Sequence, residues 1–294
     1  EMPGPHESFP TWFWDYDNDG WLDLFVGGYN MDDLGDMARI YLGGGIEADH
    51  ARVYRNAGDG TFSEVTQELG VVDRIILAMG ANYGDLDNDG FPDCYVGTGI
   101  PDLRSLIPNR MLRNEGGLRF MDVTTAGGFG NVQKGHGVSF ADLDNDGDQD
   151  VFQVMGGAFE GDLYQNVLYE NPGHGNRWLR LYPQGVHSNR GALGGRVRVQ
   201  VRRADGTERE IHHLIATGGS FGANPLAVQL GLGDAVELEF VEIIWPASNR
   251  AQRWHGLALD RAYRLREGQA AAIGVELPRF RFAARHAGHG DAAE

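Results

Sequence analysis

Residues 15–23 of the chain read Asp15-Tyr-Asp-Asn-Asp-Gly-Trp-Leu-Asp23. The same spacing of aspartates returns in Asp85-Leu-Asp-Asn-Asp-Gly-Phe-Pro-Asp93 and in Asp142-Leu-Asp-Asn-Asp-Gly-Asp-Gln-Asp150, which start 70 and then 57 residues further on. Self-similarity of this kind is typical of repeat architectures. Each copy follows a short apolar run and precedes a stretch rich in β-forming residues, so we expect each acidic loop to join two strands.

A second element recurs downstream of each loop. It reads VYRNAGDGTFSEVT at 53–66, MLRNEGGLRFMDVT at 111–124 and LYENPGHGN at 168–176. A strand, a turn of asparagine and glycine, and a second strand together predict a β-hairpin. Each unit therefore offers about four short strands, which is the content of one propeller blade.

The acidic loops carry aspartates at positions 1, 3, 5 and 9 and glycine at position 6. Turn formation explains the glycine and one aspartate. It does not explain four carboxylates in each copy, because clustered like charges are unfavourable without a cation among them. Oxygen ligands at alternating positions suit Ca²⁺ better than Mg²⁺. The predicted side-chain ligands of about three Ca²⁺ ions are Asp15, Asp17, Asp19, Asp23, Asp85, Asp87, Asp89, Asp93, Asp142, Asp144, Asp146 and Asp150.

Charge divides the 294-residue chain into two parts. The formal net charge is −17, with −21 on residues 1–175 and +4 on residues 176–294. The acidic first part argues against nucleic acid as a partner and favours cations. No run of about 18 apolar residues is present, so no membrane span is predicted. The single cysteine, Cys94, excludes an internal disulfide and is interpreted as a buried apolar residue.

From Asn176 onward the sequence predicts further strands. In residues 196–203 three valines alternate with arginines and a glutamine, which indicates a strand with one core face and one solvated basic face. An anion-binding stripe for a polysaccharide or an acidic partner is the alternative interpretation of that basic face.

The acidic loops and their flanking strands resemble FG-GAP/VCBS repeats, as found in the integrin α-subunit propellers. The following region resembles the ASPIC/UnbV domain of the cartilage acidic protein family and its bacterial relatives. The matching segments are Asn176–Leu179, Ser188–Gly195, Gly218–Gly222, Leu230–Gly233 and Ile244–Pro246. The FG-GAP resemblance implies that the backbone carbonyl at loop position 7 also binds calcium. Here these carbonyls belong to Trp21, Phe91 and Asp148.

These observations predict an all-β fold with three regions. Residues 1–175 are expected to form FG-GAP calcium-binding propeller blades, 176–268 a β-sandwich-like ASPIC/UnbV domain, and 269–294 a C-terminal extension. About three blades fall below the minimum of about four in a closed propeller. We therefore expect upstream residues, or another subunit, to cover the apolar faces of the blades.

No catalytic residues are predicted. Gly218-Gly-Ser-Phe-Gly222 matches the G-x-S-x-G nucleophile motif, but no helix-forming stretch follows it, and a glycine-rich turn is favoured. His286 and His289 have helical metal spacing without supporting carboxylates or cysteines. Whether the protein is an enzyme stays open, and a non-enzymatic role is favoured.

The pattern predicts an interaction or adhesion module with a protein or polysaccharide partner. A structural subunit of a larger assembly, or a propeller enzyme, is the alternative. Loop sites in extracellular modules are tuned to dissociation constants of roughly 10⁻⁴–10⁻³ M. We therefore expect an extracellular, periplasmic or cell-surface location, with a signal sequence upstream of residue 1.

Overall fold

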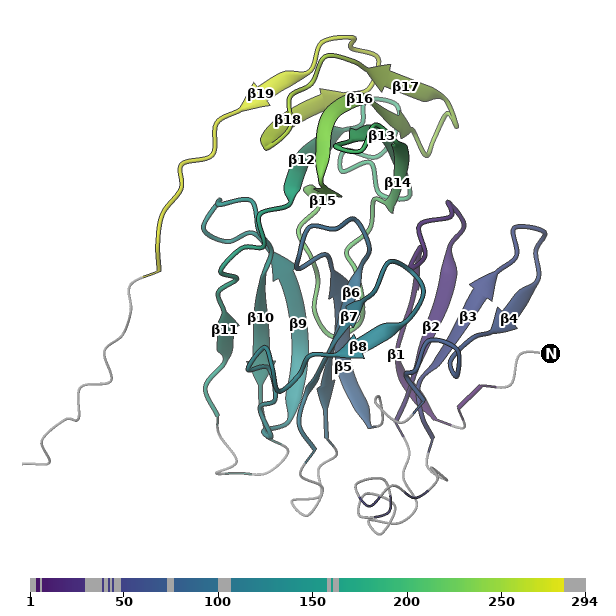
Figure 1. Ribbon diagram of the computed structural model, residues 1–294, viewed down its shortest axis with the longest axis vertical. Coiled ribbons are helices and arrows are strands. Elements are labelled where there is room, and N and C mark those ends of the chain that lie inside the picture. Colours follow the sequence, from purple (N-terminus) through teal and green to yellow (C-terminus); the bar gives the residue numbers. More distant parts are fainter. Residues whose placement is uncertain are drawn as a thin grey trace, which may run out of the picture.

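The computed structural model describes residues 4–5, 7–29, 39, 42, 44, 49–72, 77–99, 107–157, 160 and 164–282. All named elements in these residues are β-strands, which confirms the predicted all-β class. The strands form five sheets, three in the first part of the chain and two in the second (Figure 1). Within the same residues, no helix has the length and apolar character needed to cross a membrane. His286 and His289 lie outside the described residues.

The first three sheets are antiparallel blades. Blade 1 contains β1 (Ser8–Trp14), β2 (Asp23–Gly28), β3 (Arg52–Asn56) and β4 (Phe62–Glu64) in that order. Blade 2 contains β5 (Ala78–Gly84), β6 (Asp93–Thr98), β7 (Arg110–Asn114) and β8 (Phe120–Asp122). Within the described residues, blade 3 has three strands, β9 (Gly135–Ala141), β10 (Asp150–Met155) and β11 (Val167–Tyr169), and the chain then enters the second domain. Each acidic loop joins the first two strands of its blade.

The second domain consists of two sheets. One has the order β14-β13-β16-β17, formed by Glu208–Leu214, Arg196–Arg203, Ala235–Ile244 and Ala251–Trp254. The other has the order β15-β12-β18-β19, formed by Val228–Gly233, Arg177–Gln184, Arg261–Arg266 and Ile273–Val275. Side chains from both sheets, such as Leu179 and Val199, share one buried core. Strand β19 lies inside the predicted extension 269–294, so the ordered sheet continues past residue 268.

Aromatic side chains hold blade 1 against blade 2. On β1, Trp12 and Trp14 are buried while the alternate residues Thr11 and Phe13 are exposed, as expected for a strand with one core face. The rings of Trp12 and Trp14 contact Tyr83 of blade 2, with ring centroids 5.7 and 5.6 Å apart. A second core, made of Tyr95, Met111, Val138, Phe140 and Val151, joins blades 2 and 3. Burial of these large side chains is the main contribution to blade packing.

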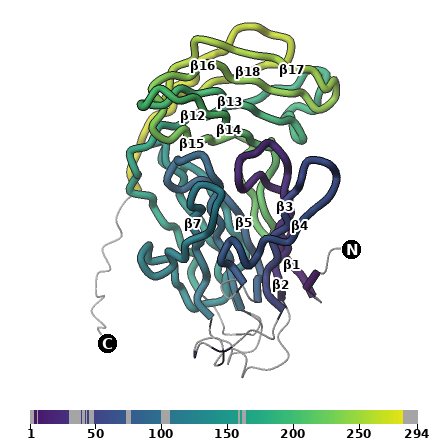
Figure 2. Tube along the Cα trace, turned by 45° about the vertical axis from the view of Figure 1, so that its right-hand side comes forward, coloured from purple at the N-terminus to yellow at the C-terminus, as the bar shows by residue number. Residues whose placement is uncertain are grey.

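The second domain lies over one end of the three blades, and both views agree on this placement (Figures 1 and 2). Its β14–β15 loop reaches down to the inner strands. The Ser220 backbone exchanges hydrogen bonds with Ala81 at 3.0 and 2.8 Å, and Val138 N–H donates to the Phe221 carbonyl at 2.9 Å. A Cβ on Gly222 would lie 2.0 Å from the Val138 carbonyl oxygen. The glycine-rich G-x-S-x-G segment therefore permits close backbone approach between the domains.

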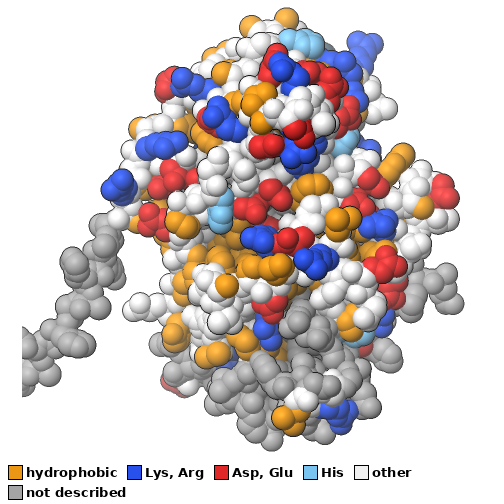
Figure 3. Space-filling view, in the orientation of Figure 1, with side chains coloured by type: hydrophobic (Ala, Val, Ile, Leu, Met, Phe, Trp, Pro, Cys, Tyr) orange, Lys and Arg blue, Asp and Glu red, His pale blue; other side chains and the backbone are white. Residues whose placement is uncertain are grey.

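Three arginines of β13, Arg198, Arg202 and Arg203, are paired with acidic side chains. Arg198 lies 3.0 Å from Glu242 and 3.2 Å from Glu210, and Arg202 pairs with Glu237 on the neighbouring strand. Positive and negative side chains accordingly lie intermixed on this domain (Figure 3). The pairing favours a solvated, charge-balanced sheet face over the anion-binding stripe.

Candidate metal centres

The first aspartate of each loop fixes the loop backbone. One carboxylate oxygen accepts the N–H of position 5 at 3.0 Å, and the other accepts the N–H of position 6 at 2.8–2.9 Å. These acceptors are Asp15, Asp85 and Asp142. The asparagine at position 4 has a left-handed backbone in every loop, with φ of 55–64°, a conformation that asparagine adopts more readily than most residues. The three acidic loops, which lie in different sequence contexts, therefore adopt the same turn conformation.

The last aspartate of each loop ties the loop to the downstream hairpin. It accepts the N–H of the hairpin asparagine at 2.8–2.9 Å and also the N–H of loop position 2. These aspartates are Asp23, Asp93 and Asp150. This contact explains why the acidic loop and the hairpin recur together in the sequence.

The hairpin asparagines of blades 2 and 3 also connect neighbouring blades. Asn114 Nδ2 donates to the carbonyl of Tyr16 in the blade 1 loop at 2.8 Å. Asn171 Nδ2 donates in the same way to Leu86 in the blade 2 loop at 2.7 Å. In the part of the chain that the structure describes, the equivalent Asn56 Nδ2 of blade 1 donates to Leu22 of its own loop, at 3.0 Å, and to no neighbouring blade. A single side chain therefore links hairpin, loop and neighbouring blade.

In each loop, three aspartates bring carboxylate oxygens within 4.8 Å of one another. The groups are Asp15, Asp17 and Asp19; Asp85, Asp87 and Asp93; and Asp142, Asp144 and Asp146. The other predicted side-chain ligands, Asp23, Asp89 and Asp150, lie in the same loops but outside these groups. An all-oxygen donor set of this kind fits a hard divalent cation such as Ca²⁺.

The position 7 residues face different surroundings. Their N–H groups donate to the position 5 aspartates at 2.8–3.0 Å. The Trp21 side chain is exposed, and Phe91 packs under the Arg209 guanidinium, which lies 4.4 Å from the ring centroid. The Asp148 carboxylate accepts a hydrogen bond from Asn88 at 2.8 Å. Calcium binding by the three carbonyls stays a prediction.

Burial and mutual repulsion disfavour ionised carboxylates in these loops. Burial is the main reason that the pKa of Asp15 is raised to about 7, and neighbouring Asp19 and Asp17 contribute to the shift. Burial likewise raises the pKa of Asp23 to about 7 and that of Asp89 to about 6. The pKa values of Asp85 and Asp93 lie well above the usual range for the same reasons, burial first. A cation among the oxygens would reverse these shifts, because it favours the charged form.

Two arginines give the loops different charge surroundings. Arg55 lies 3.0 Å from Asp17 in loop 1, and the buried Arg180 lies 2.5 Å from Asp142 in loop 3. The residue at the Arg55 position of the repeat is Arg113 in blade 2 and Glu170 in blade 3. Since charge count tunes calcium affinity, the three centres are not equivalent.

Loops 1 and 2 both contact the second domain. In loop 1, Asn18 Nδ2 donates to the Glu210 carbonyl at 3.0 Å, and His212 N–H donates to Asn18 Oδ1 at 2.7 Å. In loop 2, Arg209 Nη1 donates to the Asp89 carbonyl at 2.6 Å. The second domain therefore packs directly on the acidic loops.

Loop 3 is held from two sides. Gln229 Nε2 donates to the Gly147 carbonyl at 2.8 Å, and Arg180 completes the contact from β12. From the C-terminal segment, Arg279 donates to the Asp146 carbonyl at 2.6 Å. Sequence reasoning missed all of these partners. Only the repeated asparagine at position 4 signalled a further role for the loops.

Two protein-family models match the chain. The FG-GAP-like repeat matches residues 15–96, and the ASPIC and UnbV model matches residues 185–272. The chain therefore contains an FG-GAP-like repeat region followed by an ASPIC/UnbV domain. The FG-GAP match ends in β6, yet the third acidic loop repeats the geometry of the first two. The ASPIC/UnbV match covers β13 to β18. A comparison with curated proteins finds no match.

Proposed function

We propose that this FG-GAP-repeat protein is a calcium-binding interaction module that works outside the cytoplasm. The observation that carries the proposal is the threefold recurrence of one loop geometry with converging aspartate oxygens. Bound Ca²⁺ would neutralise the carboxylates. It would also stabilise the loop surface on which the ASPIC/UnbV domain packs. The residues that would hold the ions are the three aspartate groups named above, and the protein or carbohydrate partner would bind to the resulting rigid body.

Chelation tests the calcium assignment. Removing Ca²⁺ with a chelator should lower the melting temperature and expose residues 7–175 to protease, because repulsion among the aspartates is then unrelieved. Added Ca²⁺ should restore both properties at concentrations where Mg²⁺ does not. An unchanged melting temperature, in protein shown by elemental analysis to be metal-free, would overturn the assignment.

The proposed location outside the cytoplasm follows from the calcium affinity expected of such loop sites. Loop sites of extracellular modules bind with dissociation constants of roughly 10⁻⁴–10⁻³ M, so they fill only where calcium is abundant. A cytoplasmic protein would keep the aspartate groups uncompensated. Fractionation of the native cells should therefore recover the protein in the periplasmic, surface or extracellular fraction. Recovery of the mature protein in the cytosol would contradict the proposal.

A role as a subunit of a larger assembly is the second candidate. The outer faces of the end blades expose Phe13 by 51%, Phe152 by 38% and Val154 by 39%. Among the described residues, no amide donates to the carbonyl of Leu143, whereas the equivalent carbonyls of Tyr16 and Leu86 receive an asparagine from the next blade. A further sheet would cover such faces. Light scattering should then give a mass above that of one chain, and a monomer at all concentrations would count against this role.

A further inference from the structure

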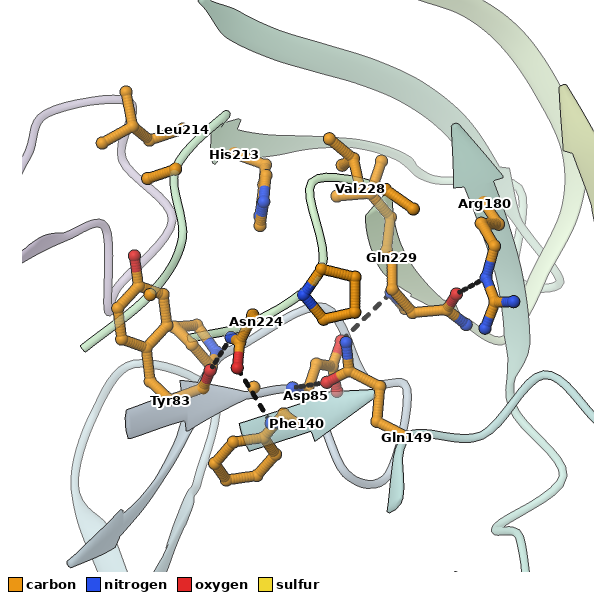
Figure 4. Close-up of a pocket in the computed structure, with 18 of the residues that line it drawn as sticks. Tyr83, Asp85, Phe140, Gln149, Arg180, His213, Leu214, Asn224, Val228 and Gln229 are labelled. Carbon is orange, nitrogen blue, oxygen red and sulfur yellow. Dashed lines mark hydrogen bonds between the residues drawn. The ribbon is translucent and has the colours of Figure 1, made fainter. Parts of the chain in front are cut away.

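A cavity of about 230 Å³ lies between the blades and the ASPIC/UnbV domain. Its floor is formed where the three inner strands β1, β5 and β9 end, around Trp14, Tyr83 and Ala141. Its other walls come from β12, β14, β15 and the loop between β14 and β15, which carries Asn224 (Figure 4). Because both domains supply walls, the cavity exists only in the docked protein.

Most polar groups around the cavity already have partners. Asn224 donates to the Tyr83 carbonyl at 2.8 Å and accepts the Phe140 N–H at 2.8 Å. Gln229 accepts from Arg180 Nε at 2.7 Å. These contacts fix the cavity walls, so their side chains are not available to a ligand.

Several lining side chains keep unused hydrogen-bonding capacity, among them the indole N–H of Trp14, His213 and Gln149. The imidazole of His213 points from β14 into the cavity (Figure 4) and has no hydrogen-bond partner within the described part of the chain. Gln149 accepts the Asp85 N–H at 2.8 Å through its carbonyl oxygen. Its amide nitrogen, in contrast, donates to no described residue. His213 is half-buried and both residues line the cavity, so a polar occupant could hydrogen-bond to both groups.

The charge of the lining indicates a neutral occupant. Arg180 is the single Lys or Arg among the lining residues, and its guanidinium is paired with Asp142 at 2.5 Å. Both oxygens of Asp15, and both of Asp85, accept backbone N–H groups of their own loops. The carboxylates of Asp15, Asp85 and Asp142 belong to the proposed calcium groups, and Arg180 is paired with Asp142. This leaves no lining charge for an ionised ligand, and an unpaired charge in such a site is unfavourable.

The volume and the lining of the cavity further restrict the class of ligand that it could bind. An apolar cavity of about 150 Å³ in another protein holds one benzene molecule. A cavity of 230 Å³ therefore accommodates one substituted six-membered ring. Apolar surface from Tyr83, Leu214 and Val228 lines the same cavity as these polar groups. A sugar ring, with C–H faces and hydroxyl edges, matches this mixture, since each hydroxyl both donates and accepts.

We propose that the cavity binds one neutral sugar residue, with hydroxyl groups hydrogen-bonded to His213 and Gln149. This proposal rests on the proposed role as an interaction module and names the class of its ligand. Pro225 and Leu226, which are exposed, line the rim and would admit a free monosaccharide or the end of a glycan.

The test is saturation-transfer NMR of the calcium-supplemented protein with glucose, galactose, mannose and N-acetylglucosamine, each at millimolar concentration. At least one sugar should bind the wild type. His213→Phe should weaken its binding about tenfold, the effect of one lost hydrogen bond. His187→Phe, which changes an exposed histidine of the same domain, should leave binding unchanged. Charged analogues such as glucuronate and glucosamine should bind more weakly than their neutral parents.

Gln149→Met provides a second, independent variant, and thermal unfolding of each variant shows whether it is folded. The sugar site is excluded if no neutral sugar binds the wild type, or if folded His213→Phe and Gln149→Met both bind like the wild type. Calcium binding is measured on the same samples. Bound calcium without sugar binding overturns the sugar site alone, whereas sugar binding without calcium overturns only the metal assignment.

Discussion

Replacing Asn114 by alanine probes the connection between blades. Its side chain is buried, with 2% exposure, and makes three hydrogen bonds. Nδ2 donates to the carbonyls of Tyr16 at 2.8 Å and Pro92 at 3.1 Å, and Oδ1 accepts the Gly117 N–H at 2.8 Å. A net contribution of about 1 kcal/mol for each bond predicts that Asn114→Ala lowers the free energy of unfolding by about 3 kcal/mol.

Asn56→Ala is the matched control, because Asn56 occupies the same repeat position without the bond between blades. The Asn56 side chain makes two equivalent hydrogen bonds: Nδ2 donates to the Leu22 carbonyl at 3.0 Å, and Oδ1 accepts the Gly58 N–H at 2.9 Å. Asn56→Ala should therefore lower the free energy of unfolding by about 1 kcal/mol less than Asn114→Ala does. Chemical unfolding in excess calcium, followed by fluorescence of Trp12 and Trp14 between the blades, measures both variants. Equal losses, or a larger loss for Asn56→Ala, would refute the role assigned to the Tyr16 contact.

Three further predictions concern the loops and the cavity. Asp87→Ala should abolish calcium binding at the middle centre and leave the other two centres intact. Isothermal titration should then detect one site fewer than in the wild type. Loss of all sites would contradict the independence of the loops. Arg209→Ala should lower the free energy of unfolding by about 2 kcal/mol, because it removes the hydrogen bond to the Asp89 carbonyl and the stacking on Phe91. The control Arg202→Ala removes an exposed ion pair and should have little effect on that free energy. Burial lowers the pKa of His213 from 6.5 to about 4. The unfolded chain therefore binds this proton first, so the contribution of His213 should lower the free energy of unfolding by up to about 3 kcal/mol between pH 6.5 and 4. His213→Gln should flatten that pH dependence, and an unchanged profile would show that His213 is not the group responsible.

The repeated loops could be predicted because their information is local. Four aspartates and a glycine within nine residues specify both the turn and the donor set, and the hairpin asparagine lies at a constant offset in blades 2 and 3. The partners of the loops could not be predicted. Asn18 meets His212 across 194 residues of sequence, and Arg209 meets Asp89 across 120. No local pattern encodes which domain surface will pack on a loop.

The same reason explains the differences at the domain boundary. The sequence of the third unit predicts a complete four-stranded blade. In the described residues this blade lacks a fourth strand, because the chain continues into β12 of the second domain. The G-x-S-x-G segment was interpreted as a turn. Its insertion against Ala81 and Val138 depends on how the two domains pack, and so does the cavity below it.

Equilibrium dialysis against Ca²⁺, with the bound ions counted per chain, tests the central claim most directly. Protein stripped with chelator and then saturated should bind three calcium ions per chain, one for each aspartate group. Asp15→Asn, Asp85→Asn and Asp142→Asn combined in one chain should reduce binding sharply, because each change removes a carboxylate from a separate group. A wild-type chain that binds no calcium at millimolar concentrations would contradict the account.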